Sequence, residues 1–149
     1  LLWAAVHGQA ETARRAIEAG ATRLSEALAL SAKHGYGSVA KIFLATDSVK
    51  RDWRDEQGQS PLLWAAARDH EAIAKLLLII GQVDIDSEDG NDQTPLSQAA
   101  GHSHEVVAKL PLATGQVDIN SKHGNGRTPL SWAAENDHEA MVKLLQLKS

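Results

Sequence analysis

The sequence predicts an all-α solenoid of stacked helix-turn-helix units, and three observations lead to this fold class. Proline recurs at an interval of 34 residues, at Pro61, Pro95 and Pro129, and three histidines and three lysines share the interval. Residues 61–87 and 95–121 are identical at 16 of 27 positions. Each copy carries two short apolar stripes at helical spacing, with a polar break between them. A period of this length indicates an array of units that bury their apolar stripes against one another.

The repeat predicts a single array of five units over residues 1–149, with approximate limits 1–24, 25–54, 55–88, 89–122 and 123–149. The offset between the first two copies shrinks to 27, because residues 20–27 lack most of the connection present elsewhere. We expect the first unit to lack its beginning and the last its end. Both ends of the chain are interpreted as cuts through a longer polypeptide.

The first helix of each unit is expected to begin at the recurring proline. Thr94 and Thr128 precede that proline, so their hydroxyls can cap a free backbone N–H group while proline occupies the first helical position. The helix is short and rich in alanine. Leu62, Ala65 and Ala66 share one face, and the small residues permit neighbouring helices to approach closely.

The second helix of each unit shows an apolar stripe at i, i+3, i+4 and i+7, represented by residues 73–80. Gly81 and Gly115 are expected to end it in the left-handed conformation. Pro111 replaces a leucine on the buried stripe, where it removes a backbone hydrogen bond and costs about 3 kcal/mol. We therefore expect the helix in the fourth unit to kink or end near Leu110, and this unit to be the least stable interior layer.

The connection after the second helix combines Val and Ile with Asp, Asn and Gly, as in "QVDIDSEDGNDQ" and "QVDINSKHGNGR". These residues favour a projecting turn or β-hairpin-like loop over a third helix.

Together these features resemble the ankyrin repeat. The matching segments are "GQSPLLWAA", "DQTPLSQAA" and "GRTPLSWAA" for the first helix, and "HEAIAKLLLIIG" and "HEVVAKLPLATG" for the second. The histidine usual in this family after Thr-Pro-Leu is replaced by Leu63, Ser97 and Ser131. The segments "TGQVD" and "NDHEA" are similar to segments of the arrays found in large multidomain fungal proteins. The resemblance implies a protein-binding array with a concave groove.

Composition excludes several classes of function. The net charge is −4, which disfavours sequence-independent binding of nucleic acid. The chain has no cysteine and therefore no disulfide or thiolate site, which fits a reducing compartment. No segment approaches the roughly 20 apolar residues of a membrane-spanning helix. We expect an intracellular, cytoplasmic protein that binds neither nucleic acid nor membrane and is monomeric as an isolated fragment.

Three patterns suggest metal binding or catalysis at first sight, and none of them supports it. His70, His104 and His138 occupy one repeat position, so they are spread along the stack and are expected to be structural, hydrogen-bonded at the turn between the helices. Residues 84–92 superficially resemble a calcium loop, but Gly90 falls one position late and solvated turn acids are the better interpretation. Ser97 and Ser131 lack a base held by a carboxylate. We expect no catalytic residue, cofactor or metal.

Binding is the function that the pattern favours. On the first helix, the face opposite the core carries residues that differ between units, and the family resemblance places this face in the groove. The candidates on this face are Trp64, Ala67 and Arg68, then Gln98, Gly101 and His102, then Trp132, Glu135 and Asn136. The candidates at the loop tips are Glu56, Gln57, Gln59, Asn91, Gln93, Asn125 and Arg127. Such differences serve recognition, although exposed positions also drift without a function.

Tryptophan leaves two alternatives open. Trp3, Trp64 and Trp132 share one repeat position and are either packed between units or partly exposed anchors for a partner. Trp53 is either a local clamp in its loop or a contact. The expected function is non-catalytic protein binding as the recognition segment of a larger protein; the alternative is a structural spacer or self-association module.

Overall fold

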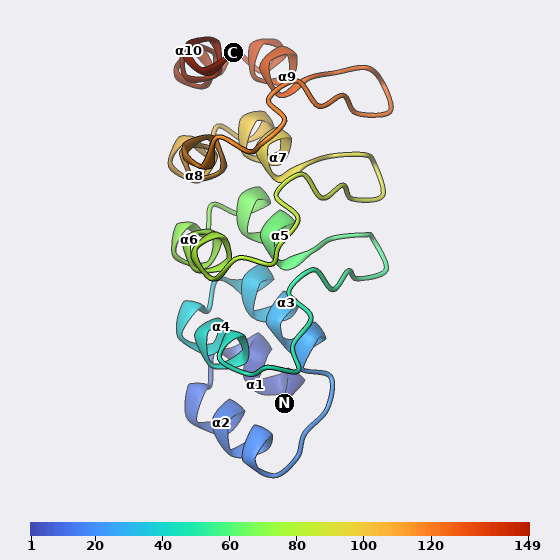
Figure 1. Cartoon of the computed structure of the whole chain (residues 1–149), viewed down its shortest axis with the longest axis vertical. Helices are drawn as coiled ribbons and strands as arrows, with labels where there is room; N and C mark the ends of the chain where they lie inside the picture. Colours follow the sequence, from blue (N-terminus) through green and yellow to red (C-terminus); the bar gives the residue numbers. More distant parts are fainter.

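The computed structural model describes residues 1–149 as ten helices without a β-strand. The helices follow one another in five pairs, which stack along the long axis of the molecule (Figure 1). Their bounds are α1 Leu2–His7, α2 Ala10–Glu18, α3 Leu24–His34, α4 Gly37–Leu44, α5 Pro61–Ala67, α6 Glu71–Ile80, α7 Pro95–Gly101, α8 Glu105–Thr114, α9 Pro129–Glu135 and α10 Glu139–Lys148. The all-α solenoid expected from the repeat is confirmed, and the unit limits stay a prediction.

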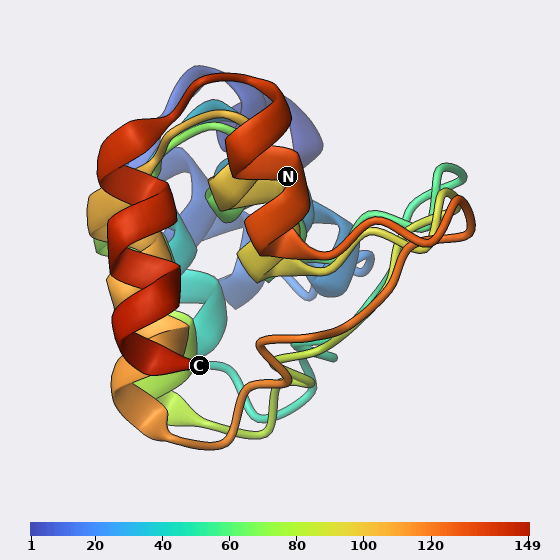
Figure 2. The ribbon, with the colours of Figure 1, turned by 90° about the horizontal axis from the view of Figure 1, so that it is seen from above.

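The helices form two layers. The odd-numbered helices pack on one another in the order α1, α3, α5, α7, α9, and the even-numbered helices form a parallel row behind them. Seen along the stack, the loops project from the side of the odd-numbered helices and nearly superimpose (Figure 2). One face of the odd-numbered row is therefore bordered by the loops.

Small and aliphatic side chains build the core between the layers. Alanines of the odd-numbered helices, including Ala65, Ala99 and Ala133, are buried, so these helices can lie close together. Leucine, isoleucine and valine fill the space behind them, and Phe43 and Met141 are the largest exceptions to that composition. The core continues through all five helix pairs, which is why one pair is stable only against its neighbours.

The starts of α5, α7 and α9 agree with the predicted caps. The hydroxyl oxygen of Thr94 accepts a hydrogen bond from the backbone N–H of Ser97 at 3.3 Å, and Thr128 accepts the equivalent bond from Ser131 at 3.2 Å. Ser60 does the same before α5. Proline is the first residue of all three helices, where its missing N–H group costs no hydrogen bond.

The three repeated histidines are structural, as predicted, but their hydrogen bonds reach further than the turn between two helices. His104 donates from Nδ1 to the carbonyl oxygen of Ala66 at 2.9 Å, and His138 donates to that of Ala100 at 3.0 Å. His70 is bonded through Nε2 to the carbonyl of Lys33 at 3.3 Å. Each histidine therefore links its helix pair to the preceding one.

Two expectations about the second helices are wrong in part, and the alternative that α8 kinks near Leu110 stays a prediction. Helix α8 does not end near Leu110 but continues through Pro111 to Thr114. Pro111 is buried, so packing against adjacent helices holds the helical path although one backbone hydrogen bond is lost. Gly115 ends α8 in the left-handed conformation as expected, whereas Gly81 has φ 74° and ψ −167°, which lies outside that region.

Three long connections project, at residues 45–60, 81–94 and 115–128, and the connection of residues 19–23 between α2 and α3 is short. Aspartates tie successive connections together. The Asp52 carboxylate accepts the backbone N–H of Asp84 at 3.0 Å, and Asp86 accepts that of Asp118 at 3.0 Å. The interpretation of residues 84–92 as solvated turn acids is therefore wrong for Asp86, and equally for Asp89, which is buried.

Candidate functional site

The face bordered by the loops is formed by residue triplets at equivalent positions of the odd-numbered helices. We call this surface the inner strip. Its members are Trp3, Val6 and His7; Leu30, Lys33 and His34; Trp64, Ala67 and Arg68; Gln98, Gly101 and His102; and Trp132, Glu135 and Asn136. The sequence interpretation named the last three triplets and, of the first two, only Trp3, although the offsets of 27 and 34 residues align them.

Each loop fixes one strip side chain through a residue nine positions earlier. The Asp55 carboxylate accepts a hydrogen bond from Nε1 of Trp64 at 3.0 Å, and the Asp89 carboxylate accepts one from Nε2 of Gln98 at 3.0 Å. In the last unit His123 replaces the aspartate, and its ring meets that of Trp132 edge-on, with the ring centroids 4.9 Å apart. The nine-residue spacing is visible in the sequence, and it could have been used to predict which loop residue contacts which strip residue.

Gln98 lies deeper than its neighbours along the strip. It is 7% exposed, and its amide donates to Asp89 and, at 2.5 Å, to the side-chain oxygen of Gln93. Asp89 also accepts from Gln59 at 2.7 Å and from two backbone N–H groups of its own turn. Gln98 therefore organises the loops, and its amide is engaged inside the protein.

The tryptophans at one repeat position combine packing with exposure. Trp132 packs on the preceding unit, because a Cβ atom on Gly101 would lie 3.1 Å from its ring. Trp3 stacks on His7 with centroids 4.4 Å apart and is 59% exposed. Trp64 is half-buried.

Two cations contact the ring of Trp64. Lys33 Nζ lies 4.4 Å from the ring centroid, and the Arg68 guanidinium carbon lies 5.3 Å from it. Cation–π contacts at these distances are attractive. Neither Lys33 nor Arg68 takes part in a salt bridge, so both charges stay available.

The last position of three triplets follows a common geometry. His7 and His102 donate from Nδ1 to the backbone carbonyl four residues earlier, both at 2.8 Å, and Asn136 donates from Nδ2 to Trp132 at 2.9 Å. Burial lowers the pKa of His34, and the positive charges of Lys33 and Arg68 lower it further. Lys33 and Arg68 therefore disfavour the charged form of His34.

The histidines and serines that invited a chemical interpretation serve the fold. The His102 and His104 rings stack with centroids 5.5 Å apart, but their Nδ1 atoms bind different carbonyl groups. No group of three or more His, Cys, Asp or Glu side chains is arranged to hold a metal ion. Ser97 donates its hydroxyl to the carbonyl of Thr94 at 2.7 Å, and Ser131 does the same to Thr128.

The predicted loop-tip residues divide into an exposed and an inward group. Glu56, Gln57, Asn91, Asn125 and Arg127 are exposed. Gln59 and Gln93 instead reach the Asp89 network described above. Arg127 is also tied to the strip, because its Nη2 lies 2.7 Å from a carboxylate oxygen of Glu135.

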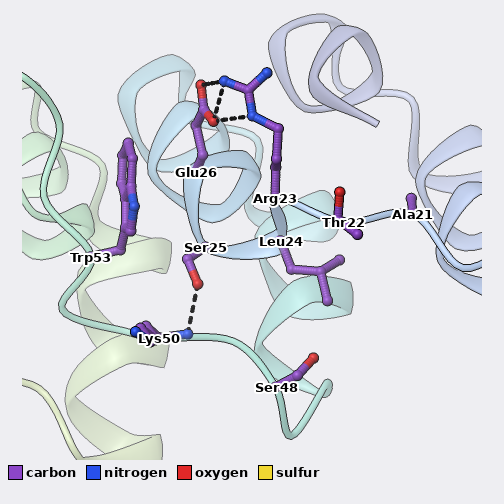
Figure 3. Close-up of a pocket in the computed structure, with 9 residues that line it drawn as sticks. All are labelled: Ala21, Thr22, Arg23, Leu24, Ser25, Glu26, Ser48, Lys50 and Trp53. Carbon is purple, nitrogen blue, oxygen red and sulfur yellow. Dashed lines mark hydrogen bonds and ion pairs between the residues drawn. The ribbon is translucent and has the colours of Figure 1, made fainter.

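Two hollows flank the first projecting loop. One, of about 540 Å³, lies between α3 and the loop and is lined by Leu30, Lys33 and Trp53 together with charged residues. The other, of about 440 Å³, places Trp53 across from the Arg23–Glu26 ion pair (Figure 3). Because the connection before α3 is short, no preceding loop covers Trp53, which is half-buried and lines both hollows.

The comparisons with known proteins agree with this architecture. A family model described as ankyrin repeats in three copies matches residues 1–89 and again residues 78–149. No curated protein matches the chain. No helix has the length and apolar character that crossing a membrane requires. Ankyrin repeats are generally protein–protein interaction modules with a typically non-catalytic fold. By its repeat, its paired helices and this match over its whole length, the chain belongs to the ankyrin repeat family.

Proposed function

We propose that the chain is the non-catalytic recognition segment of a larger intracellular protein and holds a protein partner along the inner strip and the exposed loop tips. The observation that carries this proposal is the fixed link between loop and strip at Trp64, Gln98 and Trp132. The link holds a rigid frame, while the side chains on that frame differ from unit to unit. A rigid surface with variable side chains binds at a low cost in conformational entropy.

The partner contacts are assigned to the strip residues that project, with the loop tips as a second border. In this proposal Gln98 supports the surface through Asp89, and Ala67 leaves space beside Arg68. The proposed contact residues are Trp64, Arg68, His102, Trp132, Glu135, Asn136, Glu56, Gln57, Asn91, Asn125 and Arg127.

Affinity capture with a matched pair of variants tests the proposal. One variant carries alanine at Arg68, His102, Trp132 and Glu135. The control carries alanine at Lys41, Lys109, Glu139 and Gln146, four exposed positions on the even-numbered helices. Proteins retained by the unmodified chain and by the control should be lost from the strip variant. Equal retention by all three forms would place the binding surface elsewhere.

A second function for the strip is self-association, in which the partner is another copy of the chain. Trp3, at 59% exposure, provides an apolar surface for such a contact. Sedimentation velocity over a range of concentrations separates the two functions. A concentration-independent sedimentation coefficient supports a heterologous partner, whereas a dimer that the strip variant abolishes supports self-association.

A further inference from the structure

Four consecutive units place a basic or imidazole side chain at the last position of the inner strip. These residues are His7, His34, Arg68 and His102. Lys33 adds a further charge between the second and third of them. Since the helices that carry them pack directly on one another, the residues form a row along the strip.

The centre of the row is built around Trp64. Its ring is held by the hydrogen bond from Nε1 to Asp55, and Lys33 and Arg68 lie over it. Lys33 comes from α3, whereas Arg68 directly follows α5, so the two cations join neighbouring units. Because the ring supports both side chains, their positions are ordered before a ligand arrives, which lowers the entropy cost of binding.

The positive charge is local and no salt bridge neutralises it, although the Asp55 carboxylate lies at the edge of the Trp64 ring. The chain as a whole carries a net charge of −4. Lys33 and Arg68 form no salt bridge, and the neighbouring Asp69 is exposed without binding either cation. Burial is the main cause of the lowered pKa of His34, and the charges of Lys33, Arg68 and His7 lower it further. A positive patch on an acidic protein attracts anionic groups selectively.

We propose that the surface around Lys33, Trp64 and Arg68 binds an acidic peptide segment of a protein partner, with its carboxylates paired to the two cations. The inference rests on the proposed use of the inner strip and specifies the chemistry of what binds there. The hollow of about 540 Å³ beside Lys33 is lined mostly by charged residues, and its two hydrophobic residues, Leu30 and Trp53, are the contacts for an apolar side chain of the same peptide. The preferred segment therefore combines glutamate or aspartate with an occasional large apolar residue.

Fluorescence anisotropy with two synthetic peptides tests the charge requirement. One peptide is rich in glutamate with interspersed leucine and carries a fluorescein label. The other is identical except that glutamine replaces every glutamate. The unmodified chain should bind the first peptide, and raising the ionic strength from about 0.05 M to about 0.15 M should weaken binding, because exposed charges are screened. Equal binding of the glutamine peptide would overturn the proposal.

A pair of charge-matched variants tests the location. K33Q/R68Q removes the two cations at Trp64, and K41Q/K109Q removes two exposed lysines of the even-numbered helices that form no salt bridge. The first variant should weaken binding of the glutamate peptide about tenfold, and the second should change the dissociation constant less than about twofold. An equal loss in both variants would indicate a general charge effect and contradict the assigned site.

NMR of the unmodified chain keeps the test independent of whether the variants fold. The indole N–H signal of Trp64 is identified with W64F and should shift when the glutamate peptide is added. A signal that does not move would overturn the assignment. If partner capture depends on the strip but the glutamate peptide does not bind, only the acidic specificity fails. If partner capture is also insensitive to the strip, the proposed function fails with it.

Discussion

The aspartates of the loops bind different hydrogen-bond donors, although their sequence contexts are similar. Asp55 and Asp89 accept hydrogen bonds from backbone N–H groups of their own turns and from strip side chains. Asp52 and Asp86 instead accept a backbone N–H from the following loop. Burial raises the pKa of Asp86, and the nearby Asp118 carboxylate raises it further. Ionised Asp86 therefore helps to position the next loop at an electrostatic cost.

We predict that Asp86→Asn stabilises the protein at neutral pH by less than about 1 kcal/mol, because Asp86 is only half-buried and solvent screens part of its charge. The asparagine oxygen can still accept the N–H of Asp118, while the charge is removed. The raised pKa means that the folded state binds the proton more tightly, so the unmodified chain loses stability as pH rises from about 3.8 through the raised pKa. Urea unfolding at several pH values should show the two forms converging below that window.

Asp47→Asn is the control, because Asp47 is exposed and its side chain makes no hydrogen bond. It should not reproduce the pH-dependent difference. A variant of Asp86 that is less stable at neutral pH would show that the negative charge itself holds the loop.

Residue roles were predictable where they depend on neighbours in the chain. The caps at Thr94 and Thr128 follow from the sequence, since cap and N–H group are three residues apart. Asp89 was misjudged as a solvated turn acid, because it also contacts Gln59, 30 residues earlier in the preceding loop. Lys33 was missed because its contact with Trp64 links two units, the earlier of which matches the repeat weakly.

At the scale of the element, Pro111 shows how packing overrides local preference. Proline removes the hydrogen bond to Val107 and presses on its carbonyl, yet α8 has the same ten-residue length as α6. The buried positions Val107, Ala108 and Leu112 hold α8 against its neighbours. Packing of these side chains therefore keeps α8 helical although one backbone hydrogen bond is missing.

Pro111→Leu should raise the free energy of unfolding by about 1–3 kcal/mol, because it restores the backbone hydrogen bond and removes the steric conflict. The leucine also matches Leu77 and Leu145 at the equivalent positions, both fully buried. Hydrogen exchange should show α8 less protected than α6 in the unmodified chain and equally protected in the variant. Equal protection before the substitution would mean that the proline costs α8 nothing.

At the scale of the whole molecule, stability is shared between neighbours. Each odd-numbered helix packs on the next, and the histidines extend hydrogen bonds from one helix pair to the preceding one. The first and the last helix pair lie at opposite ends of the stack (Figure 1). A substitution that destabilises one helix pair should therefore lower the stability mainly of the helix pairs next to it.

Val107→Ala should test this property, because Val107 is 2% exposed within α8. We expect a loss of about 1–2 kcal/mol from the smaller buried side chain. Hydrogen exchange followed by mass spectrometry should show lower protection in α5–α10 and little change in α1 and α2. Uniform loss of protection over all ten helices would show that the array unfolds as a single cooperative unit.

The sequence by itself determined the repeat, the helix pairs and the caps of α7 and α9. Apolar spacing, proline position and cap chemistry act within a few residues, so they can be read without knowing the fold. Only the tertiary structure decided that Gln98 is buried, that α8 continues through Pro111 and that Lys33 lies over Trp64. These outcomes depend on side chains from neighbouring units, whose distance and angle are set by how the layers stack.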